Sequence, residues 1–328
     1  MLFFSSLQNR VSCKTGFRAR SLARTWLFCL CVGALGGLRA EARAESKVMV
    51  ATLHPLLSEM VNRIAGDHVR VEELLGPAGN PHTFDPAPGD LARIQDAALV
   101  VAMGKNLETY LDRLKSALPK DARIYEAGRL VPSLRIDVES EVFMCCPAHS
   151  HGAIDPHWWH SPMAMHRAVR HLGRELEGLL PDHRRELRAN TREVMEALEA
   201  LHEWVESEIA EIPRNQRKLV TAHAAFGYFC EAYNFQSIPV QGLTTERDPS
   251  PAYLAETIGI IRKENIRAVF PEHGANPKIL ETLKQETGVF LADPLLADNT
   301  GDKNVTYADM IRLNVRHITA ALLKTDLN

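Results

Sequence analysis

The sequence has few of the features that define several large classes of protein. Only three of its six cysteines, Cys145, Cys146 and Cys230, lie after residue 44, and an odd number cannot form a complete disulfide framework. No apolar run after residue 44 reaches the roughly 20 residues that a membrane-spanning helix needs. With 45% hydrophobic and 24% charged residues, the composition argues against a disordered or collagen-like chain. We therefore expect a globular protein that folds without disulfides.

An excess of positive charge is also missing. The chain carries 38 basic and 41 acidic residues. Seven basic residues and one acidic residue fall in positions 1–44, so residues 45–328 hold 31 basic and 40 acidic residues. Binding to a phosphate backbone needs a basic face. Nucleic acid is therefore not an expected partner, and an acidic surface would instead concentrate cations in a salt-dependent way.

The first 44 residues have the pattern of a secretory signal peptide. Residues 1–24 contain five basic residues and no acid, residues 25–38 are apolar, and Ala42-Arg43-Ala44 supplies the small residues of a cleavage site. About 14 apolar residues are too few to cross ~30 Å of hydrocarbon, which argues against a membrane anchor. Lipid attachment is the remaining alternative, although Cys29 and Cys31 follow bulky residues. We expect a protein that is exported through a cleavable signal peptide and lies outside the cytoplasm.

Short apolar segments that alternate with helical patterns predict two sets of parallel βαβ units. The length of 328 residues also favours two domains. In the first set, strands are expected at Val48–Leu53, His68–Leu75 and Leu99–Met103, with helices near Leu56–Ala65 and Glu108–Ala117. In the second set, strands are expected at Lys218–Ala222, Phe235–Pro239, Ala268–Phe270 and Val289–Ala292, with helices at Phe226–Tyr233, Ser250–Glu264 and Pro277–Thr287.

A nearly uninterrupted helical region, residues 163–209, separates the two sets. Pro181 restarts it, and no proline or glycine occurs in residues 182–209, which predicts a rod about 42 Å long. Its apolar positions recur three, four or seven residues apart, so one face should pack along both domains. The expected fold is α/β, with two lobes of parallel sheet flanked by helices and joined by a long rigid helix. The expected boundaries are 45–180 for the N-terminal lobe, 181–212 for the connecting helix and 213–328 for the C-terminal lobe.

All fourteen histidines lie after residue 44, which is the most unusual feature of the composition. His82 lies in a loop that leaves the second expected strand, and His157 precedes the long helical region. His223 and Asp293 each directly follow a strand of the second set. Open α/β sheets bind ligands where strands end. Three imidazole nitrogens and one carboxylate oxygen suit a tetrahedral divalent metal ion, so these four residues are candidate ligands.

Each candidate alone also has a structural interpretation. A single histidine after a strand is more often hydrogen-bonded within the fold or exposed than bound to metal. Asp293, which precedes Pro294, is equally consistent with a turn or a helix cap. The four positions are also too far apart for a compact metal motif. The residues alone therefore leave the metal site open.

Longer segments of the chain resemble one family. The first of these segments reads GPAGNPHTFDPAPGDLARIQDAALVVAMGKNLETYLDRL. It is similar to the first metal loop of the zinc/manganese substrate-binding proteins of bacterial ABC transporters, the cluster A-I or ZnuA/TroA-like proteins. DPHWWHSPMAM and VTAHAAFGYFCEAYN resemble the second and third ligand segments, and ADPL followed by TYADMIRLNVRHITAAL resembles the C-terminal segment. The resemblance covers residues 46–325 in order. It implies that His82, His157, His223 and Asp293 bind the metal and that the lobes close only slightly, because the connecting helix is rigid.

The third ligand position bears on which metal is bound. Manganese-binding relatives tend to have a carboxylate there, whereas this sequence has His223, and three nitrogen donors favour Zn²⁺. The resemblance thus implies a non-enzymatic periplasmic receptor that captures Zn²⁺ in a cleft between two lobes and delivers it to an ABC permease in the inner membrane. A receptor for Mn²⁺ or Fe²⁺ is the alternative. The protein is expected to be a monomer.

Four more residues could bind an additional ion or support the main site. His149 and His151 lie beside two cysteines in the segment MCCPAHSHGAI, which either captures a second zinc ion or is a solvated loop. His160 follows His157 by three residues and is expected to support the site or to replace a ligand. Glu272 ends a strand and is expected to support the site or to add charge to it.

Two functions from other classes fit parts of the sequence. A secreted zinc hydrolase would need an open coordination position and a general base. Glu272 could serve as that base, but the sequence has no H-E-x-x-H motif. Three histidines with one aspartate would also close a tetrahedral site. A surface adhesin would keep the metal site without the transport role.

Overall fold

The computed structural model describes residues 47–136, 154–244 and 249–324. The predicted signal peptide and the segment with Cys145, Cys146, His149 and His151 lie outside the described residues. From residue 46 onward the chain forms one compact unit. None of the helices in the described ranges is both long and apolar enough to cross a membrane.

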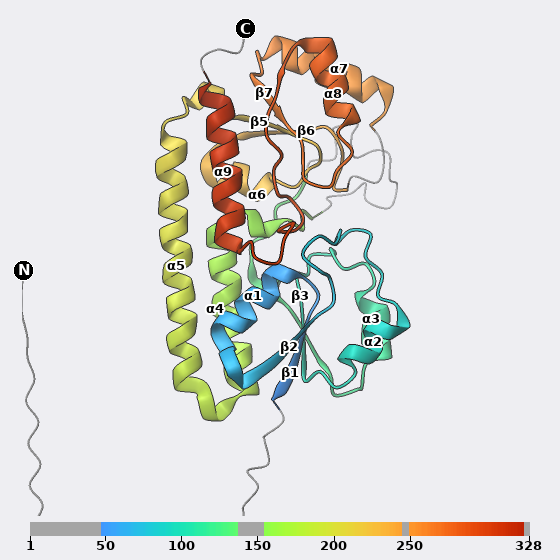
Figure 1. Cartoon of the computed structure of the whole chain (residues 1–328), viewed down its shortest axis with the longest axis vertical. Coiled ribbons are helices and arrows are strands. Elements are labelled where there is room, and N and C mark those ends of the chain that lie inside the picture. Colours follow the sequence, from blue (N-terminus) through green and yellow to red (C-terminus); the bar gives the residue numbers. More distant parts are fainter. Residues whose placement is uncertain (1–46, 137–153, 245–248, 325–328) are drawn as a thin grey trace, which may run out of the picture. The chain divides into compact units, whose positions relative to one another are not determined.

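The N-terminal lobe is built on a four-stranded parallel sheet (Figure 1). Its strands are β1 (Val48–Thr52), β2 (Val69–Glu73), β3 (Leu99–Ala102) and β4 (Arg123–Glu126), in the spatial order β2-β1-β3-β4. The connections contain the helices α1 (Pro55–Ala65), α2 (Pro88–Ile94) and α3 (Leu111–Ala117). The central strands β1 and β3 are apolar and almost entirely buried, as expected for a parallel sheet with helices on both faces.

The C-terminal lobe repeats this arrangement. Its parallel strands are β5 (Lys218–Thr221), β6 (Gln236–Pro239), β7 (Ala268–Phe270) and β8 (Phe290–Leu291), in the order β6-β5-β7-β8. Its helices are α6 (Gly227–Tyr233), α7 (Pro251–Lys263), α8 (Lys278–Thr287) and α9 (Tyr307–Leu323). In both sheets the chain first crosses to one side of the first strand and then to the other. Open α/β sheets bind ligands beside the carboxyl ends of strands at such a reversal.

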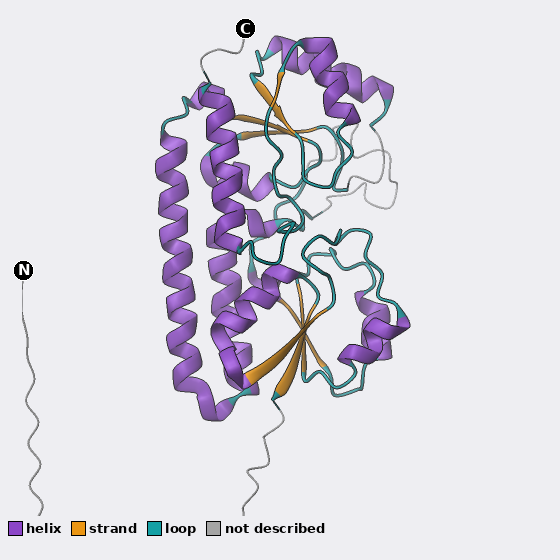
Figure 2. Ribbon diagram, viewed as in Figure 1, coloured by secondary structure: helices purple, strands orange, loops and turns teal. Residues whose placement is uncertain are grey.

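Two long helices join the lobes. α4 (Pro162–Leu179) and α5 (Arg184–Ala210) form a helical hairpin whose turn contains the 3₁₀ segment Pro181–His183. α5 packs against α1 and α4 beside the first sheet and against α9 beside the second, and Figure 2 shows it running past both sheets. At ~1.5 Å per residue, its 27 residues span about 40 Å. The predicted face of α5 is buried as expected, at Leu187, Val194, Leu198, Leu201, Val205 and Ile209. The predicted fold class, two parallel α/β lobes with a long helix, is confirmed.

One hydrophobic core extends through both lobes. Trp158 and Trp159, which are fully buried, belong to the same cluster as Val50 of the first sheet and Leu219 and Phe270 of the second. Protein interiors pack as densely as organic crystals, so a relative movement of the lobes would break many of these contacts. The shared core therefore holds the two sheets in one arrangement.

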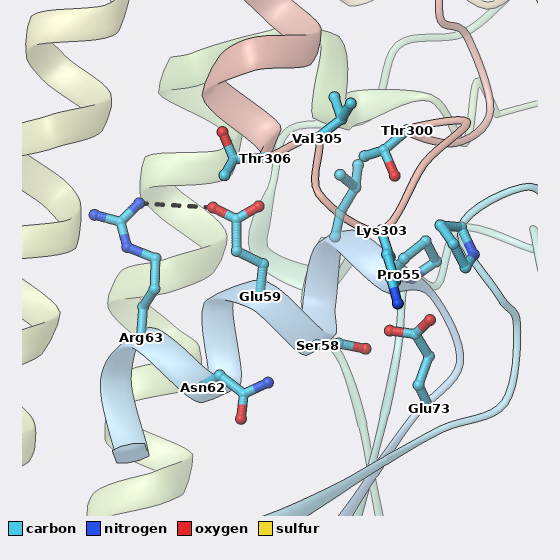
Figure 3. Close-up of a pocket in the computed structure, with 12 residues that line it drawn as sticks. Pro55, Ser58, Glu59, Asn62, Arg63, Glu73, Thr300, Lys303, Val305 and Thr306 are labelled. Atoms are coloured by element: carbon cyan, nitrogen blue, oxygen red, sulfur yellow. Dashed lines mark ion pairs between the residues drawn. The ribbon is translucent and has the colours of Figure 1, made fainter.

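A pocket of about 450 Å³ marks the seam between α1 and the segment that leads into α9 (Figure 3). Glu59 of α1 accepts a hydrogen bond from the backbone N–H of Tyr307 at 2.7 Å and forms an ion pair with Arg63 at 3.8 Å. The carboxylate of Glu59 thus satisfies a free N–H at the start of α9, where the helix dipole favours negative charge. Glu59 therefore ties α1 of the N-terminal lobe to α9.

Candidate metal centre

His82 lies in the loop between β2 and α2, as the sequence predicts. Its backbone N–H donates to Asn80 Oδ1 at 2.9 Å, which fixes a tight turn at this point. Only 6% of the His82 side chain is exposed, and its Nε2 lies 3.0 Å from Nε2 of His157. The loop therefore carries this imidazole into the interior of the protein.

His157 immediately precedes a 3₁₀ turn, Trp158–His160, and is fully buried. Asp155 Oδ1 accepts hydrogen bonds from both the backbone N–H and Nδ1 of His157, each at 2.8 Å. Because Nδ1 donates its proton to Asp155, the lone pair of the neutral ring lies on Nε2. Burial, and then the charges of the neighbouring histidines, hold the pKa of His157 well below its usual value. A Cβ atom at Gly227 would overlap Oδ2 of Asp155, so any other residue there would displace this carboxylate.

His223 lies two residues beyond the end of β5 and is also fully buried. Its backbone N–H donates to Glu272 Oε1 at 3.0 Å, and its Nδ1 donates to Glu272 Oε2. Glu272 follows β7, the neighbour of β5, so the sheet itself brings the two residues together. Glu272 therefore orients the imidazole of His223 from the side facing away from the other histidines, in the supporting position suggested by the sequence.

The carboxylate that lies beside the three histidines is that of Asp298. The sequence-based choice of Asp293 as the fourth residue of this group is wrong. Asp293 is exposed and is not part of the group. After β8 the chain continues beside the sheet, where Leu295 forms a bridge with Glu272. The buried Leu295, Leu296 and Ala297 then carry the chain inward to Asp298. The motif ADPLLAD contains two Ala-Asp pairs, and the first was chosen because it directly follows the strand.

The four donor atoms already have the spacing of a tetrahedral metal site. Asp298 Oδ1 lies 3.4 Å from His82 Nε2, 3.6 Å from His157 Nε2 and 3.4 Å from His223 Nε2. All four donor atoms lie within 4.8 Å of one another. A tetrahedron with metal–ligand bonds of ~2.0–2.1 Å has edges of about 3.3 Å. His82, His157, His223 and Asp298 therefore converge on a space of the size of one metal ion.

The electrostatics of the group favour a cation. Burial alone would raise the pKa of Asp298, but the adjacent His223 and His82 outweigh it and hold that pKa well below its usual value. Burial alone would lower the pKa of His223, but Glu272 and Asp298 raise it well above its usual value. Among the described residues, His223 Nε2 and Asp298 Oδ1 are buried without a hydrogen-bond partner. Such atoms are costly to bury, and a bound cation would satisfy both.

The backbone that carries Asp298 is fixed by side chains from elsewhere in the fold. The carbonyl oxygen of Ala297 accepts hydrogen bonds from Trp159 Nε1 and His160 Nε2, both at 2.9 Å. His160 is therefore bound to the backbone and is not one of the four converging residues. Burial lowers the pKa of His160 to about 3, so its ring is neutral. Of its two expected roles, His160 takes the supporting one.

His54, a weaker candidate for a metal role because it follows the first expected strand, holds the next carbonyl oxygen instead. It follows β1 as the N-cap of α1, where its Nδ1 accepts a hydrogen bond from the backbone N–H of Leu56 at 3.3 Å. Nδ1 must then be unprotonated, so Nε2 carries the proton and donates to the Asp298 carbonyl oxygen at 2.9 Å. Burial lowers the pKa of His54 to about 4, consistent with a neutral ring. His54 therefore supports the Asp298 backbone and is not one of the four converging residues.

Fold and site together define a class of protein: a two-lobed α/β protein with a buried group of three imidazoles and one carboxylate between its sheets. Comparison with known families makes the assignment specific. Residues 49–321 match the ZnuA family, described as zinc-uptake complex component A, periplasmic, and the chain belongs to this family. Members of the family are metal-binding transport receptors and not enzymes, as the sequence-based resemblance implied.

Relatives with different metals in their names are equally similar to this chain. The manganese-binding lipoprotein MntA of Bacillus subtilis is 29% identical over 291 residues, which cover 86% of this chain and 92% of MntA. The zinc-binding protein TroA of Treponema pallidum is also 29% identical, over 313 residues that cover 90% of this chain and 98% of TroA. The structure of TroA matches with a TM-score of 0.75 and 28% identity, over 84% of this chain and 99% of that chain.

Proposed function

We propose that the protein is the periplasmic receptor of an ABC importer and that its cargo is Zn²⁺, held by His82, His157, His223 and Asp298. The observation that supports this most strongly is the tetrahedral spacing of the four donor atoms in a buried position. The family supports the transport role and a permease as partner. The signal-peptide pattern of residues 1–44 supports export.

The donor set favours zinc over manganese. Three nitrogens and one oxygen suit the tetrahedral coordination of Zn²⁺, whereas Mn²⁺ prefers oxygen ligands in octahedral geometry. The names of MntA and TroA do not decide between the metals, because both proteins are equally similar to this chain. The imidazole of His223, where a carboxylate would favour manganese, is therefore the residue on which the preference depends.

Capture requires that the site replace the hydration shell of the ion. Asp298 would supply one negative charge in direct contact with it. The carboxylates of Asp155 and Glu272 lie directly behind His157 and His223 and offset further positive charge. The imidazoles bind metal only when Nε2 is deprotonated, so binding displaces protons and affinity falls as the pH falls. No covalent bond of a substrate is made or broken.

Competition between the two metals tests the choice of cargo. Metal-free mature protein is titrated with Zn²⁺ in the presence of excess Mn²⁺, with His223→Glu as the comparison. We expect the wild type to bind one tight equivalent of Zn²⁺ without displacement by Mn²⁺, and the variant to shift the preference of this site toward Mn²⁺. A wild-type preference for Mn²⁺ would contradict the zinc assignment and leave the receptor role intact.

Growth under zinc limitation tests the transport role. Cells that lack the gene should grow poorly in chelator-treated medium, and Zn²⁺ in excess should restore growth. The wild-type gene should also restore growth, whereas a gene encoding Asp298→Ala should not. Normal growth of the deletion strain in a background without other zinc importers would refute the transport role.

A further inference from the structure

A second group of metal-binding side chains lies on the N-terminal lobe. It consists of His68, His183 and Glu186, each of which offers one donor atom within 4.8 Å of the others. His68 ends the 3₁₀ turn that precedes β2, and His183 ends the turn between α4 and α5. Glu186 lies in the first turn of α5. Three separate elements thus present their donors to one place.

This group is distinct from the metal centre. His68 stands at the amino-terminal end of β2, whereas His82 follows the carboxyl end of the same strand. The five residues of β2, at about 3.3 Å each, place roughly 16 Å between its two ends. One ion cannot be shared between the two groups, so the second group would bind an ion of its own.

The contacts within the group show how it could close around an ion. His68 Nε2 lies 3.0 Å from Glu186 Oε2, and the ring of His68 stacks on that of His183 with centroids 3.8 Å apart and planes at 24°. Nearly parallel rings must turn before both can direct a nitrogen at one ion. The side chains of His68 and Glu186 are 25% and 58% exposed, so they have room to turn and solvent can reach them.

The surrounding backbone is held in place without an ion. Asn190 of α5 donates to the carbonyl oxygen of Ile64, near the end of α1, at 2.9 Å. Arg188 of α5 forms an ion pair with Glu177 of α4 at 2.7 Å. These contacts fix the start of α5 against both neighbouring helices. The three donors are therefore brought within reach of one another by the fold itself.

We propose that His68, His183 and Glu186 form a second, weaker Zn²⁺ site whose fourth ligand is water. Two imidazoles and one carboxylate with an open fourth position are a donor set found in zinc proteins. Because exposed side chains lose rotamer freedom on binding, the site binds less tightly than the buried one and exchanges its ion with solvent. A bound ion links the start of β2 to the turn between α4 and α5. None of these donors belongs to the metal centre, so the proposal stands apart from the proposed cargo.

Zinc content measured by equilibrium dialysis tests this site. The parent protein is the mature chain with Cys145, Cys146, His149 and His151 replaced by serine or alanine, because these residues could bind zinc themselves. We expect the parent to bind two equivalents of different affinity. Asp298→Ala should remove the tighter equivalent and leave the weaker one, which separates a failure of this proposal from a failure of the proposed function.

Variants within the group assign the weaker equivalent. His68→Ala and His183→Ala should each abolish it, whereas His171→Ala, which replaces another partly exposed histidine on α4, should retain both equivalents. Glu186→Gln keeps a hydrogen-bonding partner for His68 but removes the carboxylate. It should lower the affinity for the weaker zinc equivalent about tenfold or more. If the alanine variants fail to fold by circular dichroism, Glu186→Gln decides. The proposal is overturned if the parent binds only one equivalent of zinc, or if the affinity for the weaker equivalent is unchanged in these variants.

Discussion

At the scale of single residues, the metal centre depends on which ring nitrogen of each histidine carries a proton. His157 and His223 each donate Nδ1–H to a carboxylate, Asp155 and Glu272 respectively. Once the rings are deprotonated for metal binding, this choice of tautomer directs both Nε2 lone pairs toward Asp298. The two supporting carboxylates thus determine whether the rings can bind metal at all.

Glu272→Gln should lower zinc affinity about 10–100-fold. The amide of glutamine can place an NH₂ group against Nδ1 of His223, which favours the tautomer with the proton on Nε2, and that nitrogen then cannot bind metal. Isothermal titration with Zn²⁺ measures the effect. Glu281→Gln, at an exposed position of α8, is the matched control and should bind as the wild type does. Equal affinities for the two variants would refute the orienting role of Glu272.

At the scale of elements, the ends of helices and strands position the residues that hold the Asp298 loop. His54 caps α1 through Nδ1 and binds the Asp298 carbonyl through Nε2. Trp159 and His160 of the 3₁₀ turn bind the preceding carbonyl. The loop between β8 and α9 thus takes its conformation from elements of the other half of the chain.

His54→Asn separates the two contacts that His54 makes. Asparagine is a good N-cap, so α1 should keep its cap, while the bond to the Asp298 carbonyl is lost. The folded protein keeps His54 uncharged down to a pKa of about 4, whereas the unfolded chain binds a proton below about 6.5. The stability that this histidine contributes is therefore complete above pH 6.5 and is lost as the pH falls toward 4.

Urea unfolding of the metal-free protein at pH 7 and pH 5 measures this contribution. Between these values the wild type should lose about 2 kcal/mol more of its unfolding free energy than His54→Asn does. An identical pH dependence in both proteins would show that His54 is not buried as a neutral ring.

The sequence predicts elements better than it predicts the path of loops. The alternation of apolar and helical segments located every strand of the two sheets except β4, which is not strongly buried, and the spacing of apolar residues identified the buried face of α5. His82, His157 and His223 could be selected because each lies in a loop or turn that follows an expected strand or precedes the long helical region. Asp298 could not, because its position depends on the buried Leu295 and Leu296 carrying the chain inward past the end of β8. That path is set by tertiary packing, which leaves no local signal in the sequence.

At the scale of the whole unit, the shared core limits how far the lobes can move. α5 packs along both lobes, and the cluster around Trp158 and Trp159 joins both sheets. Opening the two lobes as rigid bodies would expose these side chains to water. The free-energy cost would be about 25 cal/mol for each Å² of apolar surface exposed. Loops at the carboxyl ends of the strands can move without this cost.

Zinc binding should therefore change loops and leave the arrangement of the lobes unchanged. Small-angle scattering of metal-free and zinc-loaded protein should give the same radius of gyration within error. Hydrogen exchange should slow mainly in the segments 76–84, 154–160 and 295–301. A clear contraction in solution would contradict the rigid-lobe account, because it would require the shared core to rearrange.

The most direct test of the central claim compares two aspartates five residues apart. Metal-free mature protein is titrated with Zn²⁺ as the wild type, Asp298→Ala and Asp293→Ala. The account predicts one tight equivalent in the wild type and in Asp293→Ala, and the loss of that equivalent in Asp298→Ala. Tight binding retained by Asp298→Ala, or lost in Asp293→Ala, would show that the three histidines and Asp298 are not the ligands of the metal.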